Sequence, residues 1–224
     1  IVENYLKKKG QVDEKGRPYL QIGEERKYFP KRVLEMKSYP LEGVYSNLTF
    51  IVEAIGSLKL ALYGLGNYVK PEAADKKPYS ELKSVARHLR SIMRVLLLKR
   101  FESSPEAFRR TVERMLSFYR KFLEGLDRGV ILSSSEIRRL FGDAEEEDWD
   151  EILESLEAKY EVDKFNLDAL REDAERDIGV FEDLLSLIEE RPEDAKLKAF
   201  KELIRERHKK GDKILVFSEY KDTA

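Results

Sequence analysis

The chain has 224 residues, enough for one large or two small domains, and 42% of them are hydrophobic, so a core can be buried. Charged residues make up 38%, which favours long solvated helices, and the formal net charge is −2. The absence of cysteine excludes a disulfide framework, a thiolate zinc site and a cysteine nucleophile. No uninterrupted apolar stretch predicts a membrane span, so we expect no membrane partner and a cytoplasmic, intracellular location.

The first 40 residues mix loops with short strand patterns. Short strands are predicted at Tyr19–Ile22 and Arg32–Met36, and Pro30 and Pro40 bracket the second of them. From residue 41 to residue 211 the apolar period is helical. The chain therefore changes character near residue 40.

Helical spacing predicts a first amphipathic helix that ends at Gly64 and Gly66, and its apolar face comprises Leu48, Ile51, Val52, Ile55, Leu58 and Leu62. A second helix covers Leu82–Leu97. Ser104 is expected to cap a third helix, with Pro105 at its first position, and this helix ends near Gly125.

Further helices are predicted at residues 133–140 and 149–156 and from about residue 167. A last helix starts at Pro192 and is closed by Gly211 as the C′ residue. Its inward face comprises Leu197, Phe200, Leu203 and Ile204. The expected fold is therefore mainly α: an antiparallel multi-helix bundle of six or seven helices, with a few short strands at its two ends.

The last segment has a different pattern. Ile214–Phe217 is a short apolar run that is typical of a buried parallel strand, and Ser218 opens a polar turn after it. Nothing earlier in the chain predicts the other strands of a parallel sheet. We therefore expect a piece of a longer protein, divided into residues 1–40, a helical domain at 41–211, and the start of an α/β domain at 212–224.

Charge is divided unevenly along the chain. Residues 76–128, the basic arm, contain 14 Lys/Arg and 6 Asp/Glu, a local charge of +8. Residues 143–194, the acidic arm, contain 5 Lys/Arg and 22 Asp/Glu, a local charge of −17. One arm suits phosphates or acidic partners, but two such arms also attract each other in a folded chain. Both interpretations stay open.

The chain offers no catalytic constellation. Gly64 and Gly66 with Lys70 lack the spacing and the Ser/Thr of a phosphate-binding loop. The histidines, His88 and His208, have no partner at a metal-binding spacing. Carboxylates are so dense in the acidic arm that their spacing indicates a solvated face. We therefore expect no catalytic residue, metal or cofactor in this chain.

Cations recur at spacings of three and four within the basic arm. Lys83, Arg87, Arg90 and Arg94 share the polar face of one helix, and the next helix repeats the pattern with Arg109, Arg110, Arg114, Arg120 and Lys121. Such a stripe can neutralise the phosphates of a nucleic acid. The alternative is an ordinary solvated face.

Three segments resemble one protein family. Lys213–Ala224 is similar to the first strand of the C-terminal RecA-like lobe of superfamily-two helicases, which carries motif IV. Leu96–Phe108 resembles a stretch between the two lobes of bacterial and archaeal Swi/Snf-type helicases, and Phe29–Leu34 looks like the start of that inter-lobe region. The three segments come in the family's order and cover about a fifth of the chain, with the last segment the most specific.

The resemblance implies the helical inter-lobe region of an ATP-dependent DNA helicase or translocase. ATP and Mg²⁺ would bind to the lobes of the parent enzyme, so this piece alone should not hydrolyse ATP. Phe217, Ser218 and Tyr220 would lie near the DNA backbone, whereas Ser104 would only cap a helix. Lys99 and Arg100 would contact nucleic acid or the first lobe, or pair with acids.

The candidate nucleic-acid-binding residues are Arg87, Arg90, Arg94, Lys99, Arg100, Arg109, Arg110, Arg114, Ser218 and Tyr220. The expected partners are double-stranded DNA and the flanking ATPase lobes. Two alternatives stay open: a protein-interaction module that uses the acidic surface of residues 143–194 and has no nucleic-acid role, and a rigid spacer between lobes.

Overall fold

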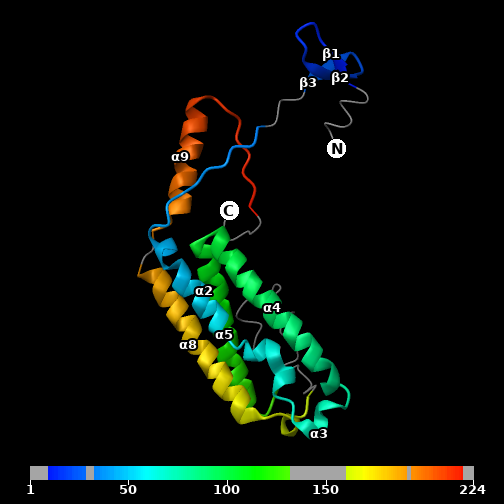
Figure 1. Ribbon diagram of the computed structural model, residues 1–224, viewed down its shortest axis with the longest axis vertical. Coiled ribbons are helices and arrows are strands. Elements are labelled where there is room, and N and C mark those ends of the chain that lie inside the picture. The colour runs from blue at the N-terminus through cyan, green and yellow to red at the C-terminus, as the bar shows by residue number, and fades with distance from the viewer. Residues whose placement is uncertain (1–9, 29–32, 132–159, 191–192, 219–224) are drawn as a thin grey trace. The chain divides into compact units, whose positions relative to one another are not determined.

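A computed structural model describes residues 10–28, 33–131, 160–190 and 193–218, and Figure 1 traces their course. The chain forms two compact units, Ile1–Ser38 and Tyr39–Ala224, and each is described by itself. The division between the units lies two residues before the predicted change of character at residue 40. The helices predicted at residues 133–140 and 149–156 lie outside the described residues.

The first unit contains an antiparallel sheet of three strands, β1 (Gln11–Val12), β2 (Pro18–Ile22) and β3 (Glu25–Tyr28). Tyr19 of β2 lies opposite Tyr28 of β3, and their ring centroids are 5.7 Å apart. The predicted strand at Tyr19–Ile22 is thus confirmed. The predicted strand at residues 32–36 is wrong over its described part, because residues 33–36 form coil and their apolar side chains are exposed.

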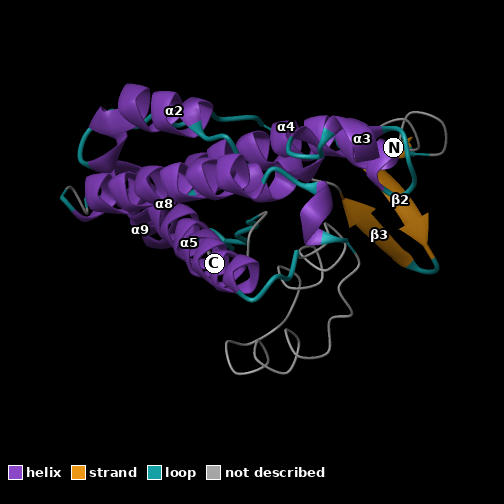
Figure 2. Ribbon diagram, turned by 90° about the horizontal axis from the view of Figure 1, so that it is seen from below, coloured by secondary structure: helices purple, strands orange, loops and turns teal. Residues whose placement is uncertain are grey.

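The second unit is helical, and the mainly α class is confirmed (Figure 2). Its described elements are η1 (Val44–Asn47), α2 (Leu48–Ser57), η2 (Ala61–Asn67), α3 (Pro71–Ala74), α4 (Tyr79–Ser103), α5 (Pro105–Asp127), η4 (Val162–Lys164), α8 (Leu167–Glu189) and α9 (Ala195–Lys209). The three long helices α4, α5 and α8 run antiparallel to their neighbours (Figure 1).

The corner between α4 and α5 is made by one residue. Ser104 is extended, with φ −162°, and its Oγ accepts a hydrogen bond from the Ala107 N–H at 3.0 Å, while Pro105 occupies the first helical position. Next to the corner, the rings of Phe101 and Phe108 pack edge to face at 5.3 Å. The predicted cap at Ser104 is confirmed.

The last helix, α9, begins three residues after the predicted start at Pro192. The Asp194 side chain caps it by accepting from the Leu197 N–H at 2.8 Å. Its C-terminus has Gly211 at φ +76°, donating from its N–H to the carbonyl of His208 at 3.0 Å, as predicted for a C′ glycine. The face predicted to point inward is only partly covered, since Leu197 and Phe200 are 44% and 39% exposed.

The core is built around the buried face of α5. Phe108, Phe118, Tyr119 and Phe122 are essentially inaccessible, and the Tyr119 ring packs edge to face on Phe181 of α8 at 5.2 Å. Burying each such side chain contributes roughly 1.5–3 kcal/mol. Apolar spacing along α5 and α8 therefore accounts for their packing against each other.

The apolar segment 44–67 differs from the single amphipathic helix predicted there. It has the length and mean hydropathy of a membrane span, yet 50% of its most apolar window is buried inside the structure. The helix stops at Ser57 and resumes only at Ala61, and Leu60 between them adopts φ +50°. Leu58, Leu60 and Leu62 are all buried in the bundle.

The buried strand predicted at Ile214–Phe217 is not present. Residues 212–218 form coil, and Leu215 and Phe217 are 84% and 89% exposed. Within the described part of this unit there is no strand long enough to pair with them. Tyr220 lies outside the described residues.

Candidate functional site

Asp177 lies in the middle of α8 and is completely buried. One oxygen of its carboxylate accepts the Lys59 N–H at 2.7 Å, and the other accepts the Ala61 N–H at 2.9 Å. The hydroxyl of Tyr119 on α5 donates to the same carboxylate at 3.1 Å. One side chain of α8 therefore holds both α5 and the turn that joins α2 to η2.

Arg94 of α4 contacts the same turn. Its guanidinium Nη2 donates to the carbonyl oxygen of Leu58 at 2.6 Å. That carbonyl and the Lys59 N–H belong to one peptide group, which is thus bonded to Arg94 at one end and to Asp177 at the other. We call Asp177, Arg94, Tyr119 and residues 58–61 the turn clamp.

The backbone of the turn explains why a carboxylate is needed there. Leu60 is a buried non-glycine residue in the left-handed region, with φ +50° and ψ +52°. This conformation turns the N–H groups of Lys59 and Ala61 toward one acceptor, like an anion-binding backbone nest. A buried N–H without a partner costs about 1–3 kcal/mol, so the Asp177 carboxylate completes the turn.

The electrostatics of the turn clamp follow from its burial. Desolvation raises the pKa of Asp177, and the hydrogen bonds from the turn and from Tyr119 oppose that shift. Burial, together with the charge of Asp177, raises the pKa of Tyr119 well above its usual value. Both carboxylate oxygens are occupied by donors, so the geometry suits a structural junction rather than proton transfer.

Arg90, one turn before Arg94, also turns toward the bundle. A Cβ placed on Gly64 would lie 3.2 Å from the Arg90 Cδ, so the glycine leaves room for this side chain. When the side-chain amide of Asn67 is oriented with its oxygen toward Arg90, that oxygen accepts hydrogen bonds from the guanidinium Nη1 at 3.1 Å and Nη2 at 3.2 Å. Arg90 and Arg94 were predicted on a solvent-facing stripe, but both contact the η2 side of the bundle.

Two neighbouring cations of α5, Arg109 and Arg110, are bonded to carboxylates. Arg109 pairs with Glu106 and Glu113, and Arg110 pairs with Glu106 at 2.7 Å. Hydrogen bonds from Arg109 and then Arg110 lower the pKa of Glu106 to about 2. Arg114 is exposed on the same helix.

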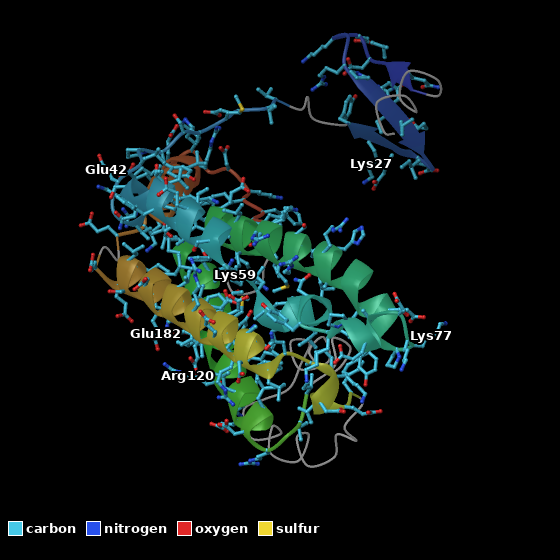
Figure 3. The ribbon with its side chains drawn as sticks, turned by 60° about the horizontal axis from the view of Figure 1, so that its bottom comes forward. Lys27, Glu42, Lys59, Lys77, Arg120 and Glu182 are labelled. Atoms are coloured by element: carbon cyan, nitrogen blue, oxygen red, sulfur yellow. The ribbon has the colours of Figure 1, made fainter. Side chains whose placement is uncertain are left out.

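Two ion pairs join the basic arm to the acidic arm. Arg120 of α5 lies 2.7 Å from Glu182 of α8, and Figure 3 shows the two side chains. Arg171 of α8 lies 2.5 Å from Asp127 at the end of α5. The attraction of the basic arm for the acidic arm is therefore realised by Arg120 and Glu182, whereas Arg171 and Asp127 join the arms with the charges reversed.

The other predicted residues are spread over several elements. Arg87 and Lys99 are exposed on α4, and Arg100 is half-buried near the end of that helix. Ser218 is exposed in the coil after α9. The structure does not gather the predicted set on one helix face.

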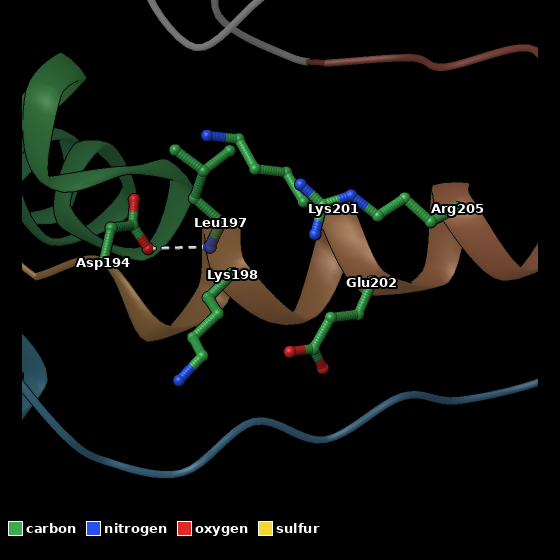
Figure 4. A pocket seen from close by; sticks show the side chains of 6 residues that line it. All are labelled: Asp194, Leu197, Lys198, Lys201, Glu202 and Arg205. Atoms are coloured by element: carbon green, nitrogen blue, oxygen red, sulfur yellow. Dashed lines mark hydrogen bonds between the residues drawn. The ribbon is translucent and has the colours of Figure 1, made fainter.

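The sequence interpretation missed a group of cations on α9. Lys198, Lys201, Arg205 and Lys209 are exposed. A shallow hollow of about 440 Å³ runs along this helix, and Figure 4 shows its lining by Asp194, Leu197, Lys198, Lys201, Glu202 and Arg205. The signal was available, since residues 195–213 contain eight Lys/Arg against three Asp/Glu.

No protein-family model, curated protein or solved structure matches the chain.

Proposed function

We propose that this chain is the helical accessory region of a Swi/Snf-type ATP-dependent DNA translocase and couples the two ATPase lobes of the parent enzyme. ATP and Mg²⁺ bind to the lobes, and the helical region passes the movement of one lobe to the other. The motif-like segments at Leu96–Phe108 and Lys213–Ala224 support the family, and the packing of the bundle supports the coupling role.

The turn clamp is the observation that carries the coupling role. Its hydrogen bonds join α4, α5 and α8 at one buried turn, through Arg94, Tyr119 and Asp177. Buried polar networks restrict the relative position of the elements that they join, and here the Asp177 carboxylate has donors at both oxygens. A bundle fixed in this way transmits displacement instead of absorbing it.

The segment at Leu96–Phe108 adds local support. It spans the corner between α4 and α5, where Phe101 and Phe108 are buried and Ser104 caps α5. A rigid corner of this kind would keep the adjoining ends of α4 and α5 together during lobe closure.

The test has a genetic and a kinetic part. The gene is expected to encode a phosphate-binding loop and an Asp-Glu box before these residues, and arginine-finger motifs after them. In the enzyme containing both lobes, Asp177→Asn should reduce DNA-stimulated translocation more than ATP hydrolysis. Neighbouring sequences without ATPase motifs, or an equal loss of both activities, would contradict the proposal.

A second candidate is a protein-interaction surface on α8. Glu172, Glu175 and Asp183 are exposed and form no ion pair within the described part of the chain. If this surface binds a basic partner, reversing these three charges would abolish that binding while leaving translocation by the full enzyme intact.

A further inference from the structure

The cations of α9 differ from those of α5 in their surroundings. Lys198, Lys201 and Arg205 are exposed, and none of them forms an ion pair with the residues that the structure describes. In contrast, Arg109, Arg110 and Arg120 of α5 are each bonded to a carboxylate. α9 thus carries a group of exposed cations that no described carboxylate pairs, unlike these three cations of α5.

Helical spacing places these cations on one face. Lys201, Arg205 and Lys209 follow one another at intervals of four residues, and Lys198 precedes Lys201 by three. Figure 4 shows the side chains of Lys201 and Arg205 along the same side of the helix. One turn rises about 5.4 Å, so the face presents a row of positive charges, with Glu202 as an acidic neighbour one turn after Lys198.

The opposite face of α9 is apolar. Leu203 and Ile204 are half-buried, and Phe200 is 39% exposed. The cationic face therefore carries no aromatic side chain on which an unpaired base could stack. Leu197 is the apolar side chain that lines the hollow beside these charges, and one such side chain is much less than the apolar stripe of a membrane-surface helix. A row of point charges with so little apolar surface fits the repeated phosphates of a nucleic-acid duplex.

The first turn of α9 fixes where this face is presented. Val44 donates from its N–H to the carbonyl of Glu193 at 3.2 Å, and Lys196 donates to the carbonyl of Ser103 at 3.0 Å. Ala195, the first residue of the helix, is its one buried residue. α9 thus projects from the end of the bundle next to the corner of α4 and α5 (Figure 1).

We propose that the face formed by Lys198, Lys201, Arg205 and Lys209 binds the phosphate backbone of double-stranded nucleic acid without reading its sequence. This site is separate from the α4 and α5 residues predicted from the sequence. It also goes beyond the coupling role, because binding by the 224-residue chain can succeed or fail independently of translocation by the parent enzyme.

The test is fluorescence anisotropy of a labelled DNA duplex titrated with the 224-residue chain at several salt concentrations. Each phosphate contact adds about 0.9 to the slope of log affinity against log salt. The variant Lys198→Ala/Lys201→Ala/Arg205→Ala should therefore reduce the slope by about 2–3 and weaken binding at least about tenfold at about 50 mM salt. Alanine favours the helix, so circular dichroism should stay unchanged.

The matched control is Arg109→Ala/Arg110→Ala/Arg120→Ala, which removes three charges from ion pairs on α5. It should change the slope by less than half as much as the α9 variant. Equal losses would show that net charge alone drives binding and would overturn the proposal. It is likewise overturned if the wild-type chain does not bind the duplex, or prefers phosphatidylserine–phosphatidylcholine vesicles to it.

Discussion

Asp177 and Arg94 are bonded to opposite ends of one peptide group. The carboxylate accepts the N–H of Lys59 at 2.7 Å, and the guanidinium donates to the carbonyl of Leu58 at 2.6 Å. Opposite charges at the two ends polarise the peptide in the same direction, which strengthens both hydrogen bonds. The helices α4 and α8 are thereby joined through the main chain of a third segment.

Removing the carboxylate should destabilise the chain strongly. In Asp177→Ala the N–H groups of Lys59 and Ala61 lose their buried acceptor, so we expect a loss of about 3 kcal/mol in the free energy of unfolding. Urea denaturation measures this loss. Asp183→Asn, an exposed change on the same helix, should alter the free energy by less than about 0.5 kcal/mol. Similar values for the two variants would contradict the role of Asp177.

The two side chains should be energetically coupled although they do not touch. In a double-mutant cycle of Arg94→Met and Asp177→Asn, the double variant should lose about 1 kcal/mol less than the two single losses added together. The physical reason is that either change already weakens the bond at the other end of the peptide. Strictly additive losses would show that the peptide transmits no coupling.

Replacing Gly43, which lies against the backbone that anchors α9, should destabilise the chain. It has φ +59°, and a Cβ built there would lie 2.2 Å from the carbonyl oxygen of Glu193. Gly43→Ala should therefore cost about 2 kcal/mol and increase hydrogen exchange at the Val44 amide. The control Gly56→Ala, in open space on α2, should instead stabilise the chain by about 0.5–1 kcal/mol.

The pKa of Glu106 offers a pH-dependent test. Arg109 and Arg110 lower it from 4.5 to about 2, so the ionised carboxylate stabilises the folded chain above about pH 4.5. This contribution is lost as the pH falls through about 2, and its size is modest because the side chain is 45% exposed. NMR titration should give a pKa near 2 for Glu106, which rises toward 4.5 in Arg109→Ala/Arg110→Ala.

The helical class followed from the sequence because caps and apolar spacing are local signals. Ser104 began its helix and Gly211 ended its helix as predicted, since a side-chain cap and a positive φ depend on a few neighbouring residues. The break at residues 58–60 was missed, because it depends on Asp177, more than a hundred residues away. The strand predicted at Ile214–Phe217 was wrong for a similar reason, because a strand requires a partner strand and the local sequence does not reveal whether one is present.

Spacing alone misplaced two of the candidate cations. Arg90 and Arg94 share a helical row with Arg87, but that row turns from solvent toward η2, where Gly64 makes room for Arg90. One signal was present: Asp177 interrupts the apolar stripe of α8 between Ala174 and Phe181, and a buried acid there demands donors. The free charges of α9 could have been found from its local excess of Lys/Arg.

Hydrogen exchange at the amides of Lys59 and Ala61 tests most directly whether the turn clamp holds the bundle as one body. If it does, both amides exchange only through global unfolding, and their exchange free energy equals the free energy of unfolding from urea denaturation. Exchange several-fold faster than the core amides of α5 would mean that the turn opens locally, and it would contradict the coupling role.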